Sequence, residues 1–155
     1  MTVPAQPHQE TVKPDWVDYN GHMNVAYYVL AFDHATDTFL DSVGMDAAWR
    51  ERTGNSVFVV EAHVTYDREV HEGDPLTVHS RPLEVGTKTL RLFHRMEHGT
   101  EGFLAATNEV MILHVDMATR RTAPWPDDVR SALESAVAAF DAPWPEQAGR
   151  AIGKR

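Results

Sequence analysis

The fold depends on one long segment, Asn24-Val-Ala-Tyr-Tyr-Val-Leu-Ala-Phe-Asp-His-Ala-Thr-Asp-Thr-Phe-Leu-Asp-Ser-Val-Gly44. Within it, apolar side chains recur at three- and four-residue spacing, as they do on the buried face of a helix. These side chains are Tyr28, Ala31, Phe32, Ala35 and Phe39. Asn24 can cap the first turn, and Gly44 can end the last one. The pattern therefore predicts one long core helix over residues 24–43.

The sequence after this helix is typical of strands. Following a short helical turn expected at residues 46–52, β-branched and aromatic residues predominate in four runs separated by turn-forming residues. The runs are Val57–Tyr66, Leu76–Leu83, Thr89–His98 and Phe103–Asp116. The third run alternates in the way that a sheet with one buried face requires, with Leu90, Leu92, His94 and Met96 between Arg91, Phe93 and Arg95. We expect consecutive antiparallel strands.

The two ends of the chain complete the expected order of elements. Prolines keep the start extended, so Gln9–Val17 is expected to form an edge strand, and Asp127–Phe140 has the pattern of an amphipathic helix. The tail from Asp141 onward is expected to lie on the surface. A helix as apolar as residues 24–43, followed by an antiparallel meander, is best buried by a sheet curled around it. The sequence predicts a single α+β domain over residues 1–155.

Composition narrows the function classes. The chain has 43% hydrophobic and 24% charged residues, which is ordinary for a globular domain, and no run is long and apolar enough for a membrane span. Its formal net charge of -9, with scattered Lys and Arg, argues against nucleic-acid binding. There is no cysteine and no secretory signal at the N-terminus, which fits a reducing compartment. We expect a cytoplasmic protein.

Chemically active side chains gather just before the core helix, in Trp16-Val-Asp-Tyr-Asn-Gly-His-Met-Asn24. A helix N-terminus presents free backbone N–H groups and a positive dipole end, which suit a carbonyl oxygen on which charge develops. Asp18 stands just before that point and could attack the carbonyl carbon or activate a water molecule. The same residues also fit a structural role, in which Asp18 and Asn20 shape a turn and Asn24 caps the helix.

The motif Asp18-x-x-Gly21-His22-x-Asn24, followed by Tyr27, resembles the opening motif of the hot-dog thioesterases related to 4-hydroxybenzoyl-CoA thioesterase. Residues 61–66 and 73–76 are similar to that family's second strand and the turn after it. More narrowly, several stretches resemble the betainyl-CoA thioesterases of carnitine degradation, found alone or fused to carnitine dehydrogenase; these are residues 16–24, 92–96, 113–116, 123–126 and 148–153.

This resemblance implies a hot-dog fold that forms homodimers or homotetramers, with active sites at the subunit interface. It also implies hydrolysis of an acyl-CoA thioester to the free acid and CoA. Asp18 would be the nucleophile or the general base, and amides of the helix N-terminus would bind the thioester oxygen. Gly21, His22 and Asn24 complete the catalytic motif, with His22 and Asn24 expected to hold the loop and cap the helix. No cofactor is implied, because coenzyme A is part of the substrate.

The narrower resemblance implies that the acyl group is betainyl, that the product is glycine betaine, and that the chain has a functional link to carnitine dehydrogenase. A trimethylammonium group prefers aromatic faces. The candidate partners are Trp16, Tyr19, Tyr27, Tyr28, Phe32 and Trp49, although aromatic residues at helical spacing are more often core residues. The alternatives are an aromatic or medium-chain acyl group, a non-catalytic acyl-CoA binding module and, third, hydratase chemistry on the same fold.

Three further groups of polar residues bear on the site. Glu61, His63 and Thr65 share one face of a predicted strand, which either borders the acyl pocket or faces solvent. The histidines show no HExxH or other compact ligand spacing, so no metal site is expected. Candidates for the CoA phosphates, which solvated sheet edges explain equally well, are Lys88, Arg91, Arg95, Arg120 and Arg121.

Overall fold

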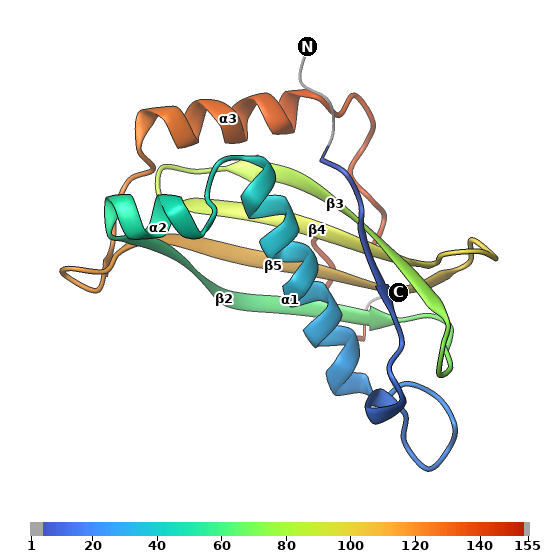
Figure 1. Ribbon diagram of the computed structural model, residues 1–155. Coiled ribbons are helices and arrows are strands. Elements are labelled where there is room, and N and C mark those ends of the chain that lie inside the picture. Colours follow the sequence, from blue (N-terminus) through green and yellow to red (C-terminus); the bar gives the residue numbers. More distant parts are fainter. Residues whose placement is uncertain (1–4, 154–155) are drawn as a thin grey trace.

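An antiparallel sheet curls around one long helix in the computed structural model, which describes residues 5–153 (Figure 1). Residues 1–4 and the last two residues of the tail lie outside this description. The elements are β1 (His8–Thr11), the 3-10 turn η1 (Pro14–Trp16), α1 (Val25–Ser42), α2 (Ala47–Thr53), β2 (Asn55–Tyr66), β3 (Pro75–Val85), β4 (Thr89–His98), β5 (Leu104–Asp116), β6 (Arg121–Thr122) and α3 (Asp127–Ala138). The expected α+β architecture is confirmed.

Helix α1 crosses one face of the sheet and forms the centre of the core (Figure 1). The side chain of Asn24 accepts a hydrogen bond from the N–H of Ala26, so the helix begins where the sequence predicts. The apolar residues expected on its buried face are buried. Its first half packs against Val78 and Met96, and its second half packs against Leu90 and Ile112. Full burial of each such large apolar side chain stabilises the folded state by about 1.5–3 kcal/mol.

A series of hydrogen bonds between polar side chains crosses this core. The hydroxyl of Thr36 donates to the carbonyl of Phe32 at 3.0 Å, so it accepts from Nε2–H of His94 at 2.8 Å. Nδ1 of His94 then accepts from the hydroxyl of Ser80 at 2.8 Å. Burial lowers the pKa of His94 to about 3. His94 is therefore a neutral core histidine whose two ring nitrogens are both satisfied.

The sheet has the order β1-β3-β4-β5-β2, and β6 pairs with β5. Strand β2 lies at one edge of the sheet, where it pairs with β5 on one side only. It has a bulge between Val59 and Glu61. Because His94 faces α1, its sheet partners Ser80 and Asn108 also face α1. Their neighbours along each strand, Arg81 and Glu109, point to the outer face of the sheet.

The C-terminal segment after α3 lies on that outer face. The guanidinium of Arg81 donates to the carbonyls of Ala142 and Pro143 at 2.6 and 2.9 Å. The backbone N–H of Gly149 donates to a carboxylate oxygen of Glu109 at 2.6 Å. The tail is thus held to the sheet at two separate points.

The main differences from the sequence prediction concern β1, β6 and α3, and the bounds of the other elements lie within two residues of those predicted. The predicted strand Gln9–Val17 is only the four-residue β1, because Pro14 has no N–H for pairing and residues 14–16 form a 3-10 turn. The two-residue β6 was not predicted, since so short a strand leaves no periodic pattern. Helix α3 ends at Ala138 rather than Phe140.

Candidate functional site

The loop from Val17 to Met23 is a tight turn closed by its own backbone. Val17 and Met23 form an isolated antiparallel bridge. Inside it, the N–H of Asp18 donates to the carbonyl of His22 at 3.2 Å, and the N–H of Gly21 donates to the carbonyl of Asp18 at 3.0 Å. Gly21 has φ +85°, a value that L-residues rarely adopt. The turn geometry therefore requires glycine at this position of the motif.

Further backbone hydrogen bonds hold the loop at the start of α1. The N–H of Asn24 donates to the carbonyl of Trp16 at 2.9 Å, and the N–H of Met23 donates to the carbonyl of Val70 at 2.9 Å. His22 forms an antiparallel bridge with His71. Asp18 consequently stands at a fixed position beside the N-terminus of the helix.

The carboxylate of Asp18 keeps one oxygen available. Its Oδ1 accepts from the backbone N–H of Asn20 at 2.8 Å, and within residues 5–153 no Lys, Arg or His forms an ion pair with it. In the same described range, the N–H of Val25 has no protein acceptor. An available carboxylate oxygen and a free N–H at the positive end of a helix are the two groups that acyl transfer needs.

Glu69 and His71 lie beside this loop, next to its own residue His22. Glu69 lies 3.6 Å from Nε2 of His22 and 3.7 Å from Nε2 of His71. All three side chains are at least one-third exposed. The sequence did not single out Glu69 or His71 as site residues, because they lie in an irregular stretch after β2. Only the fold brings that stretch to the motif.

The aromatic candidates divide between the loop and the core. Trp16 and Tyr27 stack with their ring centroids 5.6 Å apart, and the ammonium of Lys13 lies 5.2 Å from the Trp16 centroid. Tyr19, on the loop itself, is 98% exposed. Phe32 and Trp49 are buried away from the loop, against His94 and His114 respectively. They are core residues.

Tyr28 lies beneath the first turn of α1, and its burial raises its pKa. Its hydroxyl accepts from the N–H of Val70 at 3.3 Å, and its ring meets the ring of Tyr66 edge-on at 5.2 Å. The hydroxyl of Tyr66 donates to the carbonyl of Val25 at 3.3 Å. The two tyrosines thus support the helix N-terminus from below.

Glu61 and His63 are not brought to Asp18 within one chain. Val64 packs into the core beside α1, so His63 and Glu61 point to the outer face of the sheet. There they line a groove of about 360 Å³ with Arg91 and Glu109. In a single chain they form a polar row on the outer face of the sheet.

The five cations proposed for CoA phosphates also lie elsewhere. Arg91 pairs with Glu109 at 2.6 Å, and Arg95 pairs with Glu97 at 2.7 Å. The backbone of Arg121, in β6, pairs with that of Asp116, in β5. The carbonyl of Lys88 accepts a hydrogen bond from the N–H of His114. Lys88 and Arg121 thus lie near the C-terminal end of β5. The Asp18 loop instead adjoins residues 67–71, which meet the start of β5 at Ala105. Arg120 precedes Arg121 in the same turn.

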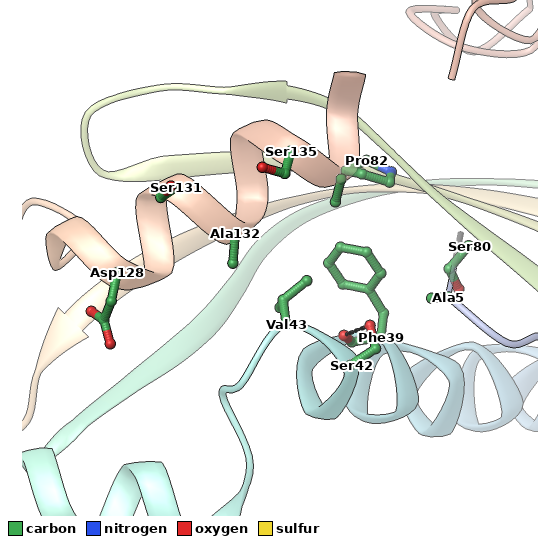
Figure 2. Close-up of a pocket in the computed structure, with 11 residues that line it drawn as sticks. Ala5, Phe39, Ser42, Val43, Ser80, Pro82, Asp128, Ser131, Ala132 and Ser135 are labelled. Carbon is green, nitrogen blue, oxygen red and sulfur yellow. Dashed lines mark hydrogen bonds between the residues drawn. The ribbon is translucent and has the colours of Figure 1, made fainter. Parts of the chain in front are cut away.

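A second hollow lies at the other end of α1. It has a volume of about 370 Å³, and Figure 2 shows Phe39 of α1 and Val43, which follows that helix, pointing towards Ala132 of α3. Asp128 is the only ionisable side chain among the described residues that line it. No expected site residue lies in it, so it contributes nothing to the chemistry around Asp18.

None of the helices within residues 5–153 has the length and hydropathy needed to cross a membrane.

Comparisons with known proteins identify the family of the chain. Residues 12–133 match the family model described as the thioesterase-like superfamily. A betainyl-CoA thioesterase from Pseudomonas aeruginosa is 37% identical over 94% of this chain and 92% of that protein. An L-carnitine dehydrogenase/betainyl-CoA thioesterase from Agrobacterium fabrum is 39% identical over 96% of this chain, which spans 30% of that longer protein.

Solved structures share the fold. The hypothetical protein SAV2348 from Staphylococcus aureus, in complex with CoA, superposes with a TM-score of 0.90 at 30% identity, over 100% of this chain and 99% of that one. A 1,4-dihydroxy-2-naphthoyl-CoA thioesterase from Synechocystis has a TM-score of 0.73 at 16% identity, over 89% and 98% of the two chains. The expected hot-dog fold is confirmed. The chain belongs to the thioesterase-like superfamily and is a hydrolase of the acyl-CoA thioesterase family.

Proposed function

We propose that this protein hydrolyses betainyl-CoA to glycine betaine and CoA. The observation that supports this substrate most directly is the 37% identity to a betainyl-CoA thioesterase over nearly the full length of both chains. The geometry supports the reaction class independently. Within residues 5–153, Asp18 presents an available carboxylate oxygen in the loop that leads into α1, and the N–H of Val25 at the N-terminus of that helix has no acceptor.

In the proposed reaction, the thioester oxygen receives a hydrogen bond from the N–H of Val25 as negative charge develops on it. Asp18 either attacks the carbonyl carbon itself or takes a proton from an attacking water molecule. With Asp18 as the general base, the carbon–sulfur bond breaks, CoA leaves as its thiol, and the acyl group leaves as a carboxylate that carries the oxygen of the water molecule. With Asp18 as the nucleophile, the same bond breaks to give an acyl–Asp18 anhydride and CoA, and a water molecule then opens the anhydride to release the carboxylate and restore Asp18. His22 and Asn24 hold the loop and cap the helix, as their backbone and side-chain hydrogen bonds already do.

The aromatic side chains at the loop are the proposed recognition site for the trimethylammonium group. Tyr27 is partly exposed and Tyr19 is almost wholly exposed, so both rings have surface available to a ligand. The Lys13 ammonium over the Trp16 ring is a cation–aromatic contact already made in this region. Tyr28 is buried and supports the loop rather than contacting the ligand.

We also propose that the working form is a homodimer, or a homotetramer built from dimers, joined through β2. The free edge of β2 carries Phe58, Val59 and Val60, which are 42%, 46% and 55% exposed. Val25 and Val29 of α1 are 58% and 45% exposed, and Val25 adjoins β2 through Tyr66. An apolar edge strand of this kind is a template for pairing with another chain. Pairing there would place a second subunit beside the Asp18 loop.

Two further proposals concern a partner enzyme and the location of the protein. The Agrobacterium protein carries both activities in its name, so we propose a functional link between this chain and a carnitine dehydrogenase. We propose the cytoplasm as its location, which cell fractionation tests.

The first experiment measures release of free thiol from betainyl-, 4-hydroxybenzoyl-, acetyl- and octanoyl-CoA. We expect the native protein to prefer betainyl-CoA and Asp18→Asn to lose most turnover while folding normally. Asp15→Asn is the matched control, because Asp15 is exposed in the same segment but outside the motif. Full activity of Asp18→Asn would remove Asp18 from the mechanism, and preference for a neutral acyl chain would overturn the substrate.

A second measurement separates this enzyme from a binding module and assigns the role of Asp18. Tight binding of betainyl-CoA without thiol release would identify a binding module. If turnover occurs, a single turnover in ¹⁸O-labelled water tests for the nucleophilic role by mass spectrometry of the protein. Label found in the Asp18 carboxylate indicates an acyl-enzyme anhydride opened at Asp18. Label found only in glycine betaine is the outcome of a general base or of an anhydride opened at the betainyl carbon, and trapping of the anhydride with hydroxylamine separates these two.

A further inference from the structure

A compact group of potential metal ligands lies outside the proposed active site. His8 and Glu10 are two residues apart on β1, so both side chains point the same way, and they meet His34 from the middle of α1. Nε2 of His8 lies 3.0 Å from one oxygen of Glu10. Nδ1 of His34 lies 2.9 and 3.0 Å from the two oxygens of Glu10. One carboxylate is thus shared by two imidazoles from different elements.

The hydrogen bonds of Thr38 decide which nitrogen of His8 is protonated. The hydroxyl of Thr38 donates to the carbonyl of His34 at 3.2 Å, and the same oxygen lies 2.9 Å from Nδ1 of His8. Both hydrogen bonds form together only when Nδ1 of His8 carries the proton. Nε2 of a neutral His8 then presents a lone pair to the Glu10 carboxylate. Two acceptors 3.0 Å apart need a positive charge between them.

The carboxylate of Glu10 has no other cation to meet this need. Its side chain is only 13% exposed, and among residues 5–153 its ion-pair partners are His8 and His34 alone. A buried carboxylate without Lys or Arg is stabilised by a bound cation or by protonated neighbours. Two imidazoles and a carboxylate are also a donor set that zinc uses, with a fourth position open to water.

The distances fit this donor set. The three ligand atoms all lie within 4.8 Å of one another. Tetrahedral Zn²⁺ with bonds of about 2.0–2.1 Å separates its ligand atoms by roughly 3.3 Å. The two histidine-to-carboxylate separations of 2.9–3.0 Å would therefore open by a few tenths of an ångström as a metal ion replaces the shared protons, and the two imidazole nitrogens, which lie within 4.8 Å of each other, would come to the same spacing. The hydrogen bond from Nδ1 of His8 to Thr38 is the kind of outer contact that orients a metal-bound imidazole.

We propose that His8, Glu10 and His34 bind one Zn²⁺ ion that fastens the edge strand β1 to α1. His34 lies ten residues beyond Asn24, or about 15 Å along the helix, so the ion is structural and takes no part in chemistry at Asp18. The sequence analysis expected no metal site, because His34 is more than twenty residues from His8 and Glu10 and meets them only when β1 lies along α1.

The test uses the full, untagged chain, treated with a chelator and then titrated with Zn²⁺ by calorimetry. We expect one ion per chain and a rise in melting temperature. We expect Glu10→Gln and His34→Gln each to weaken binding by about tenfold or more, and Thr38→Val to weaken it by about 10–100-fold through the orientation of His8. Titration with Co²⁺ should give the visible bands of a tetrahedral site in the native chain and in the control described below, and much weaker bands in Glu10→Gln and His34→Gln.

His79→Gln is the matched control. His79 also faces a carboxylate, Glu97, at 3.6 Å, but within the described part of the chain it joins no three-ligand group. It should bind Zn²⁺ like the native chain. Equal Zn²⁺ affinity in the native chain, Glu10→Gln and His34→Gln would overturn the proposal, and so would the absence of binding by the native chain. None of these measurements depends on the substrate or on thioester hydrolysis.

Discussion

Gly21 tests at a single residue whether the loop geometry matters for catalysis. A Cβ at Gly21 would meet no atom within 4 Å, so Gly21→Ala changes only the backbone preference at φ +85°. We expect a loss of about 1–2 kcal/mol in the free energy of unfolding. We also expect a marked fall in turnover, because the turn that positions Asp18 would relax. Thiol release and urea unfolding measure the two effects.

Gly44 provides the control for that substitution. It has φ +88° and equally open surroundings, but it ends α1 at the far end from the loop. Gly44→Ala should therefore cost similar stability and leave turnover per folded molecule unchanged. Equal turnover in the two variants would show that the shape of the loop is not part of the mechanism.

His94 predicts a dependence of stability on pH. Its pKa in the folded protein is about 3, against 6.5 for the ordinary group. Between these values the unfolded chain binds a proton that the native chain does not, so stability is lost as pH falls below about 6.5. From pH 7 to pH 5 the loss attributable to His94 is about 2 kcal/mol. Urea unfolding at both pH values measures it.

His94→Gln should remove this part of the pH dependence, although it lowers stability at pH 7. His79→Gln, at a half-exposed histidine of the neighbouring strand, should keep the native slope. If His94→Gln and the native chain lose the same stability between pH 7 and pH 5, the buried histidine is not the source.

At the scale of elements, Arg81 joins the tail to the sheet. Its guanidinium donates to two tail carbonyls and lies 5.1 Å from the ring centroid of Phe140. Arg81→Met keeps much of the side-chain length but removes the donors, so we expect faster cleavage within residues 141–153 in limited proteolysis. Mass spectrometry of the fragments locates the cuts. Arg95→Met, which leaves the tail contacts intact, should give the native cleavage rate.

The elements that the sequence predicted well are those with a strong periodic pattern. Tyr28, Phe32 and Phe39 recur at helical spacing, and they form the buried face of α1. Leu90, Leu92 and His94 alternate along β4, and they face α1 as predicted. Short elements gave no such pattern. The ends of β1 and β6 depend on a proline and on pairing with distant strands rather than on local propensity.

The candidate site was predictable where its residues are consecutive. Asp18, Gly21 and Asn24 lie within one loop, so their spacing already indicated the turn and the cap that the structure shows. Glu69 and His71 reach the loop through the bridge between His22 and His71 and the hydrogen bond from Met23 to Val70. The sequence could place Glu61 and His63 on one face of a strand. Whether that face points towards α1 or to the outside of the sheet depends on the bulge and on the curl of the sheet.

At the scale of the whole molecule, the apolar edge of β2 predicts self-association. Val60 is 55% exposed at the bulge, and a lysine there would oppose pairing with another chain. We expect Val60→Lys to shift the protein from dimer to monomer in light scattering and to lose most thioester hydrolysis. The monomer should remain folded, because Val60 contributes nothing to either core cluster.

Ile152→Lys controls for the added charge, since Ile152 is 93% exposed on the tail. It should remain dimeric and active. A monomeric native protein with full activity would show that β2 is not the subunit interface.

The tail on the outer face of the sheet also limits how four chains can assemble. Residues 142–149 cover Arg81 and Glu109, near the middle of that face. Two dimers stacked back to back through their sheets would consequently meet tail against tail at these positions, not strand against strand. Deletion of the tail would then alter the assembly of dimers into tetramers before it altered the pairing of β2 edges.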